Sequence, residues 1–383
     1  MGGIWSGDYH HGKQMLRSLG KIWNDAAVTP SHTHSHTHSH THSHTHMSIT
    51  ERFLANREAL ISHNQFLSHL LVAFDDNYHL ELPRAPGLSE ACEAAFGSYT
   101  CTHTHTRTCT CSALTSVCTG LRDSMSVSSS GLSDDCTCTC SDCSECSDCS
   151  DDNKLLIPFR EVIGAVGSYE WRRRGVLVPA LGDGVRIYPH FSVFAPSARQ
   201  EYIKLLAEVP LPKPPGGLRL GYDVGVGTGV LTALMIKRGV QNVVATDVNP
   251  RALECARDNL TRLGLLQRVK LVEGDIFPCG EYPTDSEGAD LIVCNPPWLP
   301  LPPQSMLDKG VYDHKSDTLK SFLLNVRHHL KPSTGECFLI ISDLAELLGL
   351  RSRGELLDMI DEGGLEVMGK TDTPAEHRRG SVP

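Results

Sequence analysis

The tetrapeptide Asn295-Pro-Pro-Trp298 combines residue types that can hold a planar amino group. Its two prolines, Pro296 and Pro297, lock the turn and direct the preceding carbonyls outward. The Asn295 side-chain oxygen and the Pro296 carbonyl could then accept both hydrogens of an NH₂ group, while the Trp298 ring offers a flat face to an amide or a base. That arrangement can aim a nitrogen lone pair at an electrophilic carbon without a strong general base. A structural proline-rich loop is the alternative, since Leu299-Pro-Leu-Pro-Pro303 continues in the same style.

A glycine-rich turn upstream of this motif is suited to close approach by a ligand. Its sequence is Asp223-Val-Gly-Val-Gly-Thr-Gly229. Without Cβ atoms, Gly225, Gly227 and Gly229 allow the backbone to turn sharply and approach a ligand, and the helix that follows offers unpaired N–H groups. A dinucleotide site has the spacing G-x-G-x-x-G, whose third glycine would fall at Val230. The match to that spacing is therefore poor.

Two acids after the next expected strands could complete a nucleoside site. Asp247 ends the second strand, where a carboxylate can accept hydrogen bonds from both ribose hydroxyls of an adenosine-containing ligand. Asp275, in the run Glu273-Gly-Asp275 after the third strand, could reach the adenine. A plain tight turn with surface acids is the alternative interpretation. The loop, the acid and the strand order together favour nucleoside binding over that alternative.

The elements that must position these residues alternate between short apolar runs and stretches with helical spacing. Expected strands lie at 218–224, 242–246, 269–272, 289–294, 336–341 and 365–369, and expected helices at 228–237, 250–263, 316–330 and 352–362. Strands alternating with helices predict a mostly parallel sheet covered on both faces, which is a Rossmann-like α/β fold. In such a sheet ligands bind at the carboxyl ends of the strands, where the Asn-Pro-Pro-Trp motif and the glycine loop both fall.

Composition divides the 383-residue chain into six parts. They are an N-terminal segment (1–30), a His/Ser/Thr tract (31–47), a helical N-terminal region (48–100), a Cys/Ser/Thr/Asp tract (101–152), a pre-core segment with a lid (153–215) and the α/β domain (216–383). The helical expectation for 48–100 rests on apolar residues at helical spacing, from Phe53 to Leu70 and Leu71. With 40% hydrophobic residues the chain can bury a large core, which excludes a wholly disordered protein.

Both low-complexity tracts are expected to be disordered, because neither can bury enough apolar surface to offset the entropy of ordering. Ten of the 15 cysteines lie in the second tract, with no spacing typical of a disulfide framework. A folded zinc ribbon needs two separated cysteine pairs around a core, which this tract lacks. We therefore expect no structural metal.

Charge and hydropathy exclude few partners. Seven acids at 131–152 account for most of the formal charge of −10, so acidity says little about the rest of the chain. No apolar stretch is long enough for a membrane helix, and residues 1–16 lack the apolar core of a signal peptide. We expect a soluble, intracellular, cytoplasmic protein without a membrane partner, and an organelle address stays open.

The run from Asp223 to Trp298 resembles the class I S-adenosylmethionine-dependent methyltransferases. Within them it is similar to the branch with an Asn-Pro-Pro-aromatic motif, which contains amino-methylating DNA and RNA enzymes and the release-factor glutamine methyltransferases. The chain also resembles small-domain methyltransferases over most of its length outside the two tracts. The segments that carry this likeness are Leu82-Pro-Arg-Ala-Pro86, Glu170-Trp-Arg172, His190-Phe-Ser-Val-Phe-Ala-Pro196, Val293-Cys-Asn-Pro-Pro-Trp-Leu299 and Ser342-Asp-Leu-Ala-Glu346.

This resemblance implies a fold and a role for each candidate residue. The sheet would be of the seven-strand methyltransferase type, lacking its last strand because the chain stops at Pro383. The cofactor would be S-adenosylmethionine, held by Asp223, Gly225, Gly227, Gly229 and Asp247, and the nitrogen to be methylated would be held by Asn295, Pro296, Pro297 and Trp298. In relatives a comparable segment folds over the cofactor, so Phe194 and Pro196 are lid candidates. An extended linker packed on the core is the alternative for that segment.

The implied activity is transfer of a methyl group from S-adenosylmethionine to a planar nitrogen by direct displacement. The acceptor would be a protein glutamine amide or an exocyclic base amine, so the partner would be a protein or a nucleic acid. The run Trp171-Arg-Arg-Arg174 could grip nucleic-acid phosphates or could be a solvated turn. Two alternatives remain: a non-catalytic cofactor-binding or metal-binding scaffold, and a nucleotide-dependent oxidoreductase, which the loop spacing disfavours.

Overall fold

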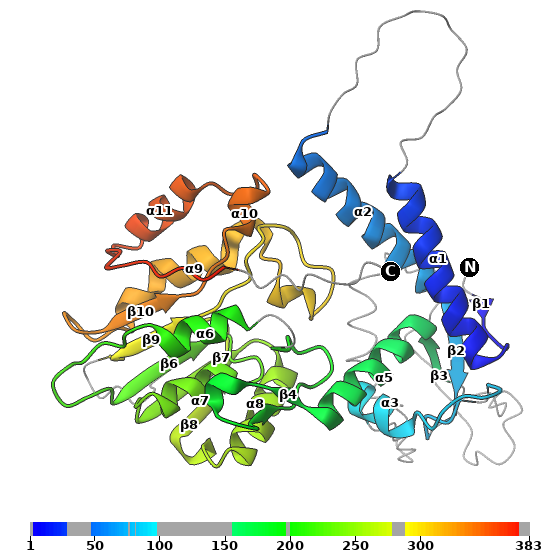
Figure 1. Ribbon diagram of the computed structural model, residues 1–383, viewed down its shortest axis with the longest axis horizontal. Coiled ribbons are helices and arrows are strands. Elements are labelled where there is room, and N and C mark those ends of the chain that lie inside the picture. The colour runs from blue at the N-terminus through cyan, green and yellow to red at the C-terminus, as the bar shows by residue number, and fades with distance from the viewer. Residues whose placement is uncertain are drawn as a thin grey trace, which may run out of the picture. The chain divides into compact units, whose positions relative to one another are not determined.

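The predicted alternation folds into a parallel sheet in the computed structural model, which describes residues 3–28, 47–75, 77–80, 82–97, 155–196, 200–277 and 288–374. Five described strands form it: β6 (Leu220–Val224), β7 (Asn242–Asp247), β8 (Val269–Glu273), β9 (Leu291–Cys294) and β10 (Glu336–Leu339). Their spatial order is β10-β9-β6-β7-β8 (Figure 1). The low-complexity tracts at 31–46 and 101–152, with their predicted disorder, lie outside the described residues.

Helices cover both faces of this sheet, as the alternation predicts (Figure 1). One face packs against α6 (Glu201–Glu208), α7 (Val230–Lys237) and α8 (Pro250–Arg262), and the other against α9 (Asp317–Asn325) and α11 (Arg353–Glu362). Successive residues of a strand point to opposite faces, so Val243 and Ala245 lie in the first core and Val244 in the second. The short pair β4 (Val176–Leu177) and β5 (Arg186–Ile187) precedes α6, and α10 (Leu344–Leu347) follows β10.

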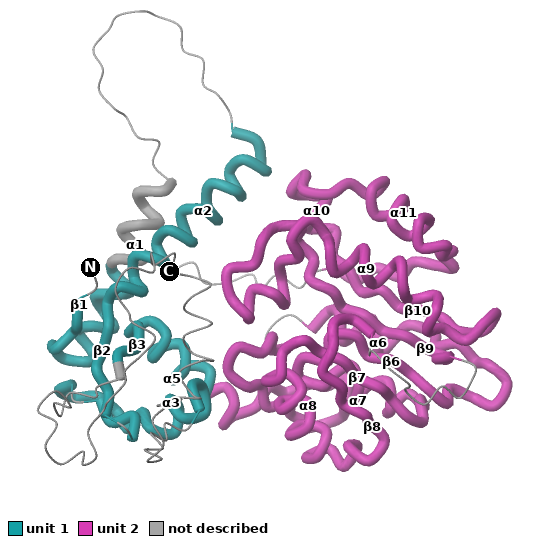
Figure 2. Tube along the Cα trace, turned by 180° about the vertical axis from the view of Figure 1, so that it is seen from behind, with its two compact units in different colours: residues 1–169 teal, residues 170–383 magenta. Residues whose placement is uncertain are grey.

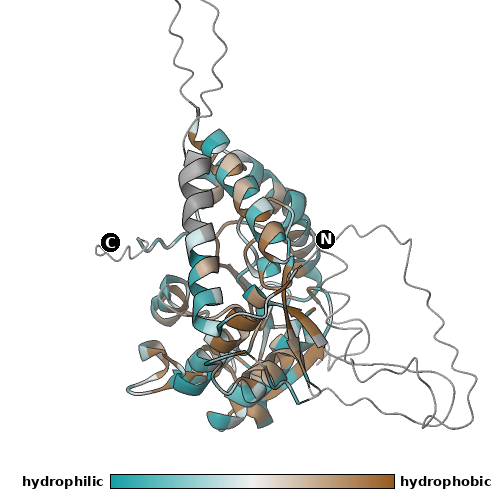
Figure 3. Ribbon diagram, turned by 90° about the vertical axis from the view of Figure 1, so that its right-hand side faces the viewer, coloured by the Kyte–Doolittle hydropathy of each residue, from teal (hydrophilic) through white to brown (hydrophobic). Residues whose placement is uncertain are grey.

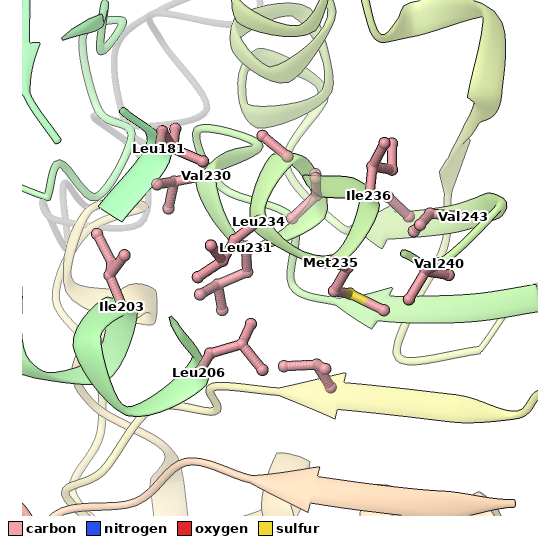
Figure 4. Close-up of a cluster of buried hydrophobic side chains, with 14 of the residues drawn as sticks. Leu181, Ile203, Leu206, Val230, Leu231, Leu234, Met235, Ile236, Val240 and Val243 are labelled. Carbon is pink, nitrogen blue, oxygen red and sulfur yellow. The ribbon is translucent and has the colours of Figure 1, made fainter. Parts of the chain in front are cut away.

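Helix α7 is at the centre of the larger core (Figure 4). Its first seven residues, from Val230 to Ile236, are all buried, which is typical of a helix that is apolar on every side. Leu206 of α6 and Val243 of β7 belong to the same buried cluster. The helix begins at Val230 rather than at the predicted position 228, because Gly229 has a φ of 79° and cannot continue a right-handed turn.

The chain divides into two units, residues 1–169 and 170–383 (Figure 2). The first contains β1 (Gly3–Ile4), α1 (Tyr9–Val28), α2 (Ile49–Leu67), β2 (Leu70–Phe74), α3 (Ser89–Phe96), β3 (Leu155–Pro158) and most of α5 (Phe159–Arg174). Strand β2 pairs parallel to β1 and antiparallel to β3. The helices of this unit carry hydrophilic and hydrophobic residues side by side (Figure 3). No helix in the described part of the chain is both long and apolar enough to cross a membrane.

Two stretches differ from the secondary structure expected near the N-terminus. Leu70 and Leu71, expected in a helix, begin strand β2. The run from Leu70 to Phe74 is continuously apolar, so it fits helical spacing as well as a buried strand, and pairing with β1 and β3 decides the outcome. Helix α1 lies where no element was expected, and the Asp8 carboxylate accepts the backbone N–H of His10 at 3.0 Å at its start.

The C-terminal part of the sheet is also smaller than predicted. Residues 365–369, expected as a strand, form none: Gly364 turns the chain with a φ of 65°, and Val367 and Met368 are 54% and 81% exposed. The apolar alternation there does not reach a buried face. The helix expected at 316–330 ends at Asn325 and continues only as a 3₁₀ turn to His328. Within the described residues the seven-strand count implied by the resemblance is not confirmed.

Candidate active site

The register of three neighbouring strands brings the motif, the glycine loop and the first acid to one edge of the sheet. The last residue of β6 pairs with the last residue of β9 and with Thr246 of β7. All three strands are parallel. The residues that come next along the chain, Gly225, Asn295 and Asp247, therefore leave the sheet at the same carboxyl edge, which is where ligands bind in sheets of this kind.

The glycine loop leaves open space in front of its first two glycines. Gly225, Gly227 and Gly229 have φ angles of 81°, 51° and 79°. A Cβ added to Gly225 or Gly227 would meet no atom within 4 Å, whereas one added to Gly229 would lie 3.3 Å from Ala256 on α8. The first two glycines thus border space that a ligand can enter, and the third lets α7 and α8 pack closely.

Asp247 ties the glycine loop to the end of β7. Its Oδ2 accepts the Gly227 N–H at 3.0 Å, and its Oδ1 accepts the Asn249 N–H at 2.9 Å. Burial raises the pKa of this carboxyl, and the backbone N–H groups oppose the rise. A carboxylate has roughly four acceptor positions, so this one can also accept hydrogen bonds from ligand hydroxyls.

The loop after β8 is held at the same edge and carries Asp275. The Gly274 N–H donates to the Asp247 carbonyl at 3.2 Å. On the other side, Thr246 Oγ1 donates to the Ile276 carbonyl at 2.7 Å. Asp275 lies between these two anchored residues, and its side chain is exposed. The structure therefore brings both acids named from the sequence to the edge where the glycine loop lies.

Asp223 is fully buried in β6 and has one free oxygen. Its Oδ2 accepts a hydrogen bond from Thr232 Oγ1 at 2.5 Å, while Oδ1 has no hydrogen-bond partner among the described residues. Burial raises the pKa of Asp223 to about 7, and the nearby Asp247 carboxylate adds to the rise. A buried acceptor without a partner is costly unless something satisfies it, so Asp223 is suited to a ligand that brings a hydrogen-bond donor or a positive charge.

In the Asn-Pro-Pro-Trp motif the first and last side chains contact each other. The Trp298 indole N–H donates to Asn295 Oδ1 at 3.0 Å, which fixes the orientation of both. The amide oxygen keeps a second lone pair, and Asn295 is only half-buried, so it can still accept a hydrogen from a bound amino group. Pro296 is buried and Pro297 half-buried. The sequence predicted only the flat face of Trp298 and not this hydrogen bond.

Residues 188–196, which contain the lid candidates, are anchored on α8. The Tyr188 N–H donates to Asn259 Oδ1 at 2.8 Å. The Asn259 amide in turn donates to the Thr228 carbonyl of the glycine loop at 3.1 Å. One buried asparagine therefore joins this segment to the glycine loop.

The two lid candidates differ in exposure. Phe194 is 41% exposed and lies against Gly310, where an added Cβ would be 3.3 Å from Phe194 Cβ. Pro196 is buried, and its carbonyl accepts a hydrogen bond from the Gln200 side chain at 3.0 Å. Phe194 is thus free to contact a ligand, whereas Pro196 is part of the packing.

The run Trp171-Arg-Arg-Arg174 forms the last turn of α5, and Trp171, Arg173 and Arg174 are exposed to solvent. Its first arginine, Arg172, forms an ion pair with Asp258 at 3.3 Å. The other two pair with Glu170 at 3.4 Å and 3.3 Å. A phosphate at this turn would have to compete with those carboxylates.

Sequence reasoning missed several buried polar residues near the site. They are Thr232, Asn259, Asp313, Ser316 and Arg351, each at most 7% exposed. A lone polar residue among apolar neighbours, such as Thr232 in α7, was the available signal. Their partners are mostly distant in the sequence, so motif spacing could not identify them.

No group of His, Cys, Asp or Glu suited to a metal ion occurs in the described residues, and the cysteine- and histidine-rich tracts lie outside them.

The raised pKa of Asp223 predicts a pH-dependent effect of Asp223→Asn on stability. Because the folded pKa of about 7 exceeds the ordinary value of 3.8, the folded state holds an extra proton between these values, and the contribution of Asp223 to stability falls as pH rises toward 7. Asparagine cannot ionise. Urea unfolding measures the free energy of unfolding of Asp223→Asn and of the wild type at each pH. The difference between the two should be about 2–3 kcal/mol more favourable to Asp223→Asn at pH 7.5 than at pH 5.

The exposed Asp361 provides the control for this measurement, since Asp361→Asn makes the same replacement of a carboxylate by an amide outside the buried core. An equal difference between Asp223→Asn and the wild type at both pH values would show that Asp223 is already ionised in the folded protein at pH 5.

Comparison with known proteins agrees with this geometry. Residues 222–333 match the family described as a methyltransferase domain. A tRNA1(Val) (adenine(37)-N6)-methyltransferase from Shewanella loihica is 25% identical over 39% of this chain and 60% of its own length. A putative protein N5-glutamine methyltransferase from Methanocaldococcus jannaschii is 27% identical over 39% of this chain and 72% of its own. The release factor glutamine methyltransferase of Deinococcus radiodurans is 42% identical over 23% of this chain and 30% of its own.

The matched region therefore spans less than two thirds of the first and third of these relatives. The family match begins inside β6 and ends before β10, so it includes the glycine loop, both acids and the Asn-Pro-Pro-Trp motif. The open space at the first two glycines and the free oxygen of Asp223 fit a nucleoside ligand with a donor group. Residues 222–333 are accordingly similar to a methyltransferase domain over the stretch that contains the candidate site.

Proposed function

We propose that this protein transfers a methyl group to a planar nitrogen, either a protein glutamine amide or the exocyclic amine of a base. The observation that carries the proposal is the position of Asn295, which directly follows β9 at the edge where Cys294 pairs with Val224, the residue before Gly225. An acceptor held by Asn295 and a cofactor held by the loop would therefore be neighbours. The relatives are named for methylation of adenine N6 and of glutamine N5, and both atoms are planar nitrogens.

The residues around the glycine loop would hold S-adenosylmethionine in four ways. Gly225 and Gly227 give it room next to the backbone. The Asp247 carboxylate would accept its ribose hydroxyls, and the exposed Asp275 would accept a hydrogen bond from its adenine. The free oxygen of the buried Asp223 would face its positively charged amino group. When bound, S-adenosylmethionine supplies a methyl group on a positively charged sulfur.

The Asn-Pro-Pro-Trp motif would hold the acceptor. The second lone pair of Asn295 Oδ1 and the Pro296 carbonyl would each accept one hydrogen of the NH₂ group, which directs the nitrogen lone pair away from both oxygens. The Trp298 ring would stack on the planar acceptor, while its N–H keeps the Asn295 amide in place. The catalytic contribution of this chain is therefore mainly alignment and hydrogen bonding.

The two alternatives explain fewer of these contacts. A nucleotide-dependent oxidoreductase has no use for an amide and a carbonyl that together bind an amino group. A non-catalytic scaffold would keep the cofactor contacts without needing the hydrogen bond between Trp298 and Asn295. The match to the methyltransferase-domain family also disfavours both.

Substitution by alanine should have different effects at Gly225 and Gly229, although their φ angles are similar. Gly225→Ala should cost only the strain of the left-handed conformation, about 1 kcal/mol, but should weaken S-adenosylmethionine binding, because the new Cβ enters open space that the cofactor would fill. Gly229→Ala should be more destabilising, because its Cβ also presses against Ala256. Calorimetric titration with S-adenosylmethionine and urea unfolding measure the two effects. Equal affinity of Gly225→Ala and the wild type would show that the cofactor does not use this space.

Asn295→Ala tests whether the acceptor and the cofactor are bound by different residues of the site. This substitution should lower methyl transfer by about a hundredfold or more, because the acceptor loses one of its two hydrogen-bond acceptors, while the affinity for S-adenosylmethionine should change little. The assay follows transfer of a labelled methyl group from S-adenosylmethionine to macromolecules of a cell extract. Asn325→Ala, at an exposed asparagine of α9, is the matched control. Parallel loss of transfer and of cofactor binding would contradict this assignment of roles.

The same assay separates the two classes of acceptor. Loss of the macromolecular label on protease treatment is expected for a glutamine acceptor, and loss on nuclease treatment for a base amine. Labelled protein would next be hydrolysed to look for N5-methylglutamine. Label that appears only in small molecules would contradict both classes.

A further inference from the structure

The segment at residues 311–313 is fixed to the second half of the Asn-Pro-Pro-Trp motif. The Trp298 and Leu299 N–H groups both donate to the Val311 carbonyl at 3.1 Å. The Asp313 N–H donates back to the Leu299 carbonyl at 2.8 Å. The position of this short segment therefore decides where Trp298 lies, and with it the hydrogen bond that orients the Asn295 amide.

The backbone just after this segment is strained. Lys315 and Ser316 are consecutive non-glycine residues in the left-handed region, with φ angles of 54° and 59°. Residues in this region are uncommon and persist only where surrounding contacts hold them. The Lys315 side chain is exposed, whereas Ser316 is 3% exposed. The contact that holds the turn is therefore on the Ser316 side.

Arg351 supplies that contact from the turn after α10. Its guanidinium donates to Ser316 Oγ at 3.1 Å, and its side chain is buried. The buried Asp313 carboxylate attracts this guanidinium and also accepts the N–H groups of Thr318 and Leu319 at the start of α9. The segment that supports the motif is thus held at its C-terminal end by buried polar groups, and no motif identified in the sequence includes Ser316 or Arg351.

We propose that Ser316 and Arg351 are positioning residues for the Asn-Pro-Pro-Trp motif. By holding residues 311–313, they keep the Trp298 indole N–H on Asn295 Oδ1 and leave the second lone pair of that oxygen directed at the acceptor nitrogen. Neither residue contacts the acceptor or the cofactor. This role rests on the proposed function, because it matters for transfer only if Asn295 binds the nitrogen.

The decisive variant is Ser316→Gly in the full chain. Glycine relieves the left-handed strain, so loss of folding is not expected, but it removes the hydroxyl that Arg351 holds. Lys315→Gly is the matched control, because it relieves the same kind of strain and keeps the hydroxyl. Arg351→Met removes the donor, and Arg351→Lys restores one N–H to Ser316. Thermal unfolding of every variant accompanies the other measurements.

Two readouts report on positioning. One is the rate of labelled methyl transfer from saturating S-adenosylmethionine to macromolecules of the cell extract. The other is the indole N–H signal of Trp298 in ¹⁵N-labelled protein, assigned by its absence in Trp298→Phe. Ser316→Gly and Arg351→Met should each lower the rate by about tenfold and shift the indole signal toward its position in Asn295→Ala. Arg351→Lys should recover part of the rate and part of the wild-type position of the indole signal. Lys315→Gly should match the wild type in both readouts.

Non-additivity separates positioning from general destabilisation. If Ser316 acts through Asn295, then Ser316→Gly combined with Asn295→Ala should lower the rate no further than Asn295→Ala alone. A wild-type rate and a wild-type indole signal in Ser316→Gly, together with a low rate in Asn295→Ala, would overturn the positioning role and leave the proposed function standing. A wild-type rate in Asn295→Ala would overturn the proposed function itself, whatever the indole signal shows.

Discussion

The register of β9, β6 and β7 is the constraint on which the candidate site depends. A shift of one residue in a strand moves each of its side chains to the opposite face of the sheet. Here both faces are buried, with Val243 and Ala245 in one core and Val244 in the other, so a shift would disrupt two cores at once. Core packing therefore fixes the register. The register pairs Val224 with Cys294, so the residues that follow them, Gly225 and Asn295, leave the sheet at the same edge.

The turns at this edge contain residues with positive φ angles of two kinds, glycines and residues with side chains. Gly225 and Gly227 adopt positive φ angles without a side chain and border open space. Ile276 and Ser316 adopt similar angles with a side chain. Ile276 and Ser316 are both buried. A hydrogen bond from Thr246 to the Ile276 carbonyl holds the first, and one from Arg351 to the Ser316 hydroxyl holds the second. Gly225 and Gly227 thus lie where the backbone borders empty space, whereas Ile276 and Ser316 lie where the protein itself supplies the contact.

Local patterns in the sequence were enough to predict the five strands, the helices between them and the residues that follow the strand ends. They failed where tertiary contacts decide, as at Leu70 and Leu71, whose apolar run fits a helix until β1 and β3 pair with it. They also could not reveal that Asn259 joins the glycine loop to Tyr188, 71 residues earlier in the chain. Contacts across such separations leave no spacing to recognise. The side chains that support the candidate site were accordingly harder to predict than those that line it.

An amide and an exocyclic base amine present the same pair of hydrogens on a planar nitrogen. In the proposed reaction, the two acceptors of the Asn-Pro-Pro-Trp motif would therefore select an NH₂ group and not the molecule that bears it. Selection between a protein and a nucleic acid must come from other surfaces. Among these, the three arginines that end α5 already pair with Asp258 and Glu170. A phosphate backbone that used these arginines would first have to displace those carboxylates, and each such exposed ion pair is worth only about 0–1 kcal/mol.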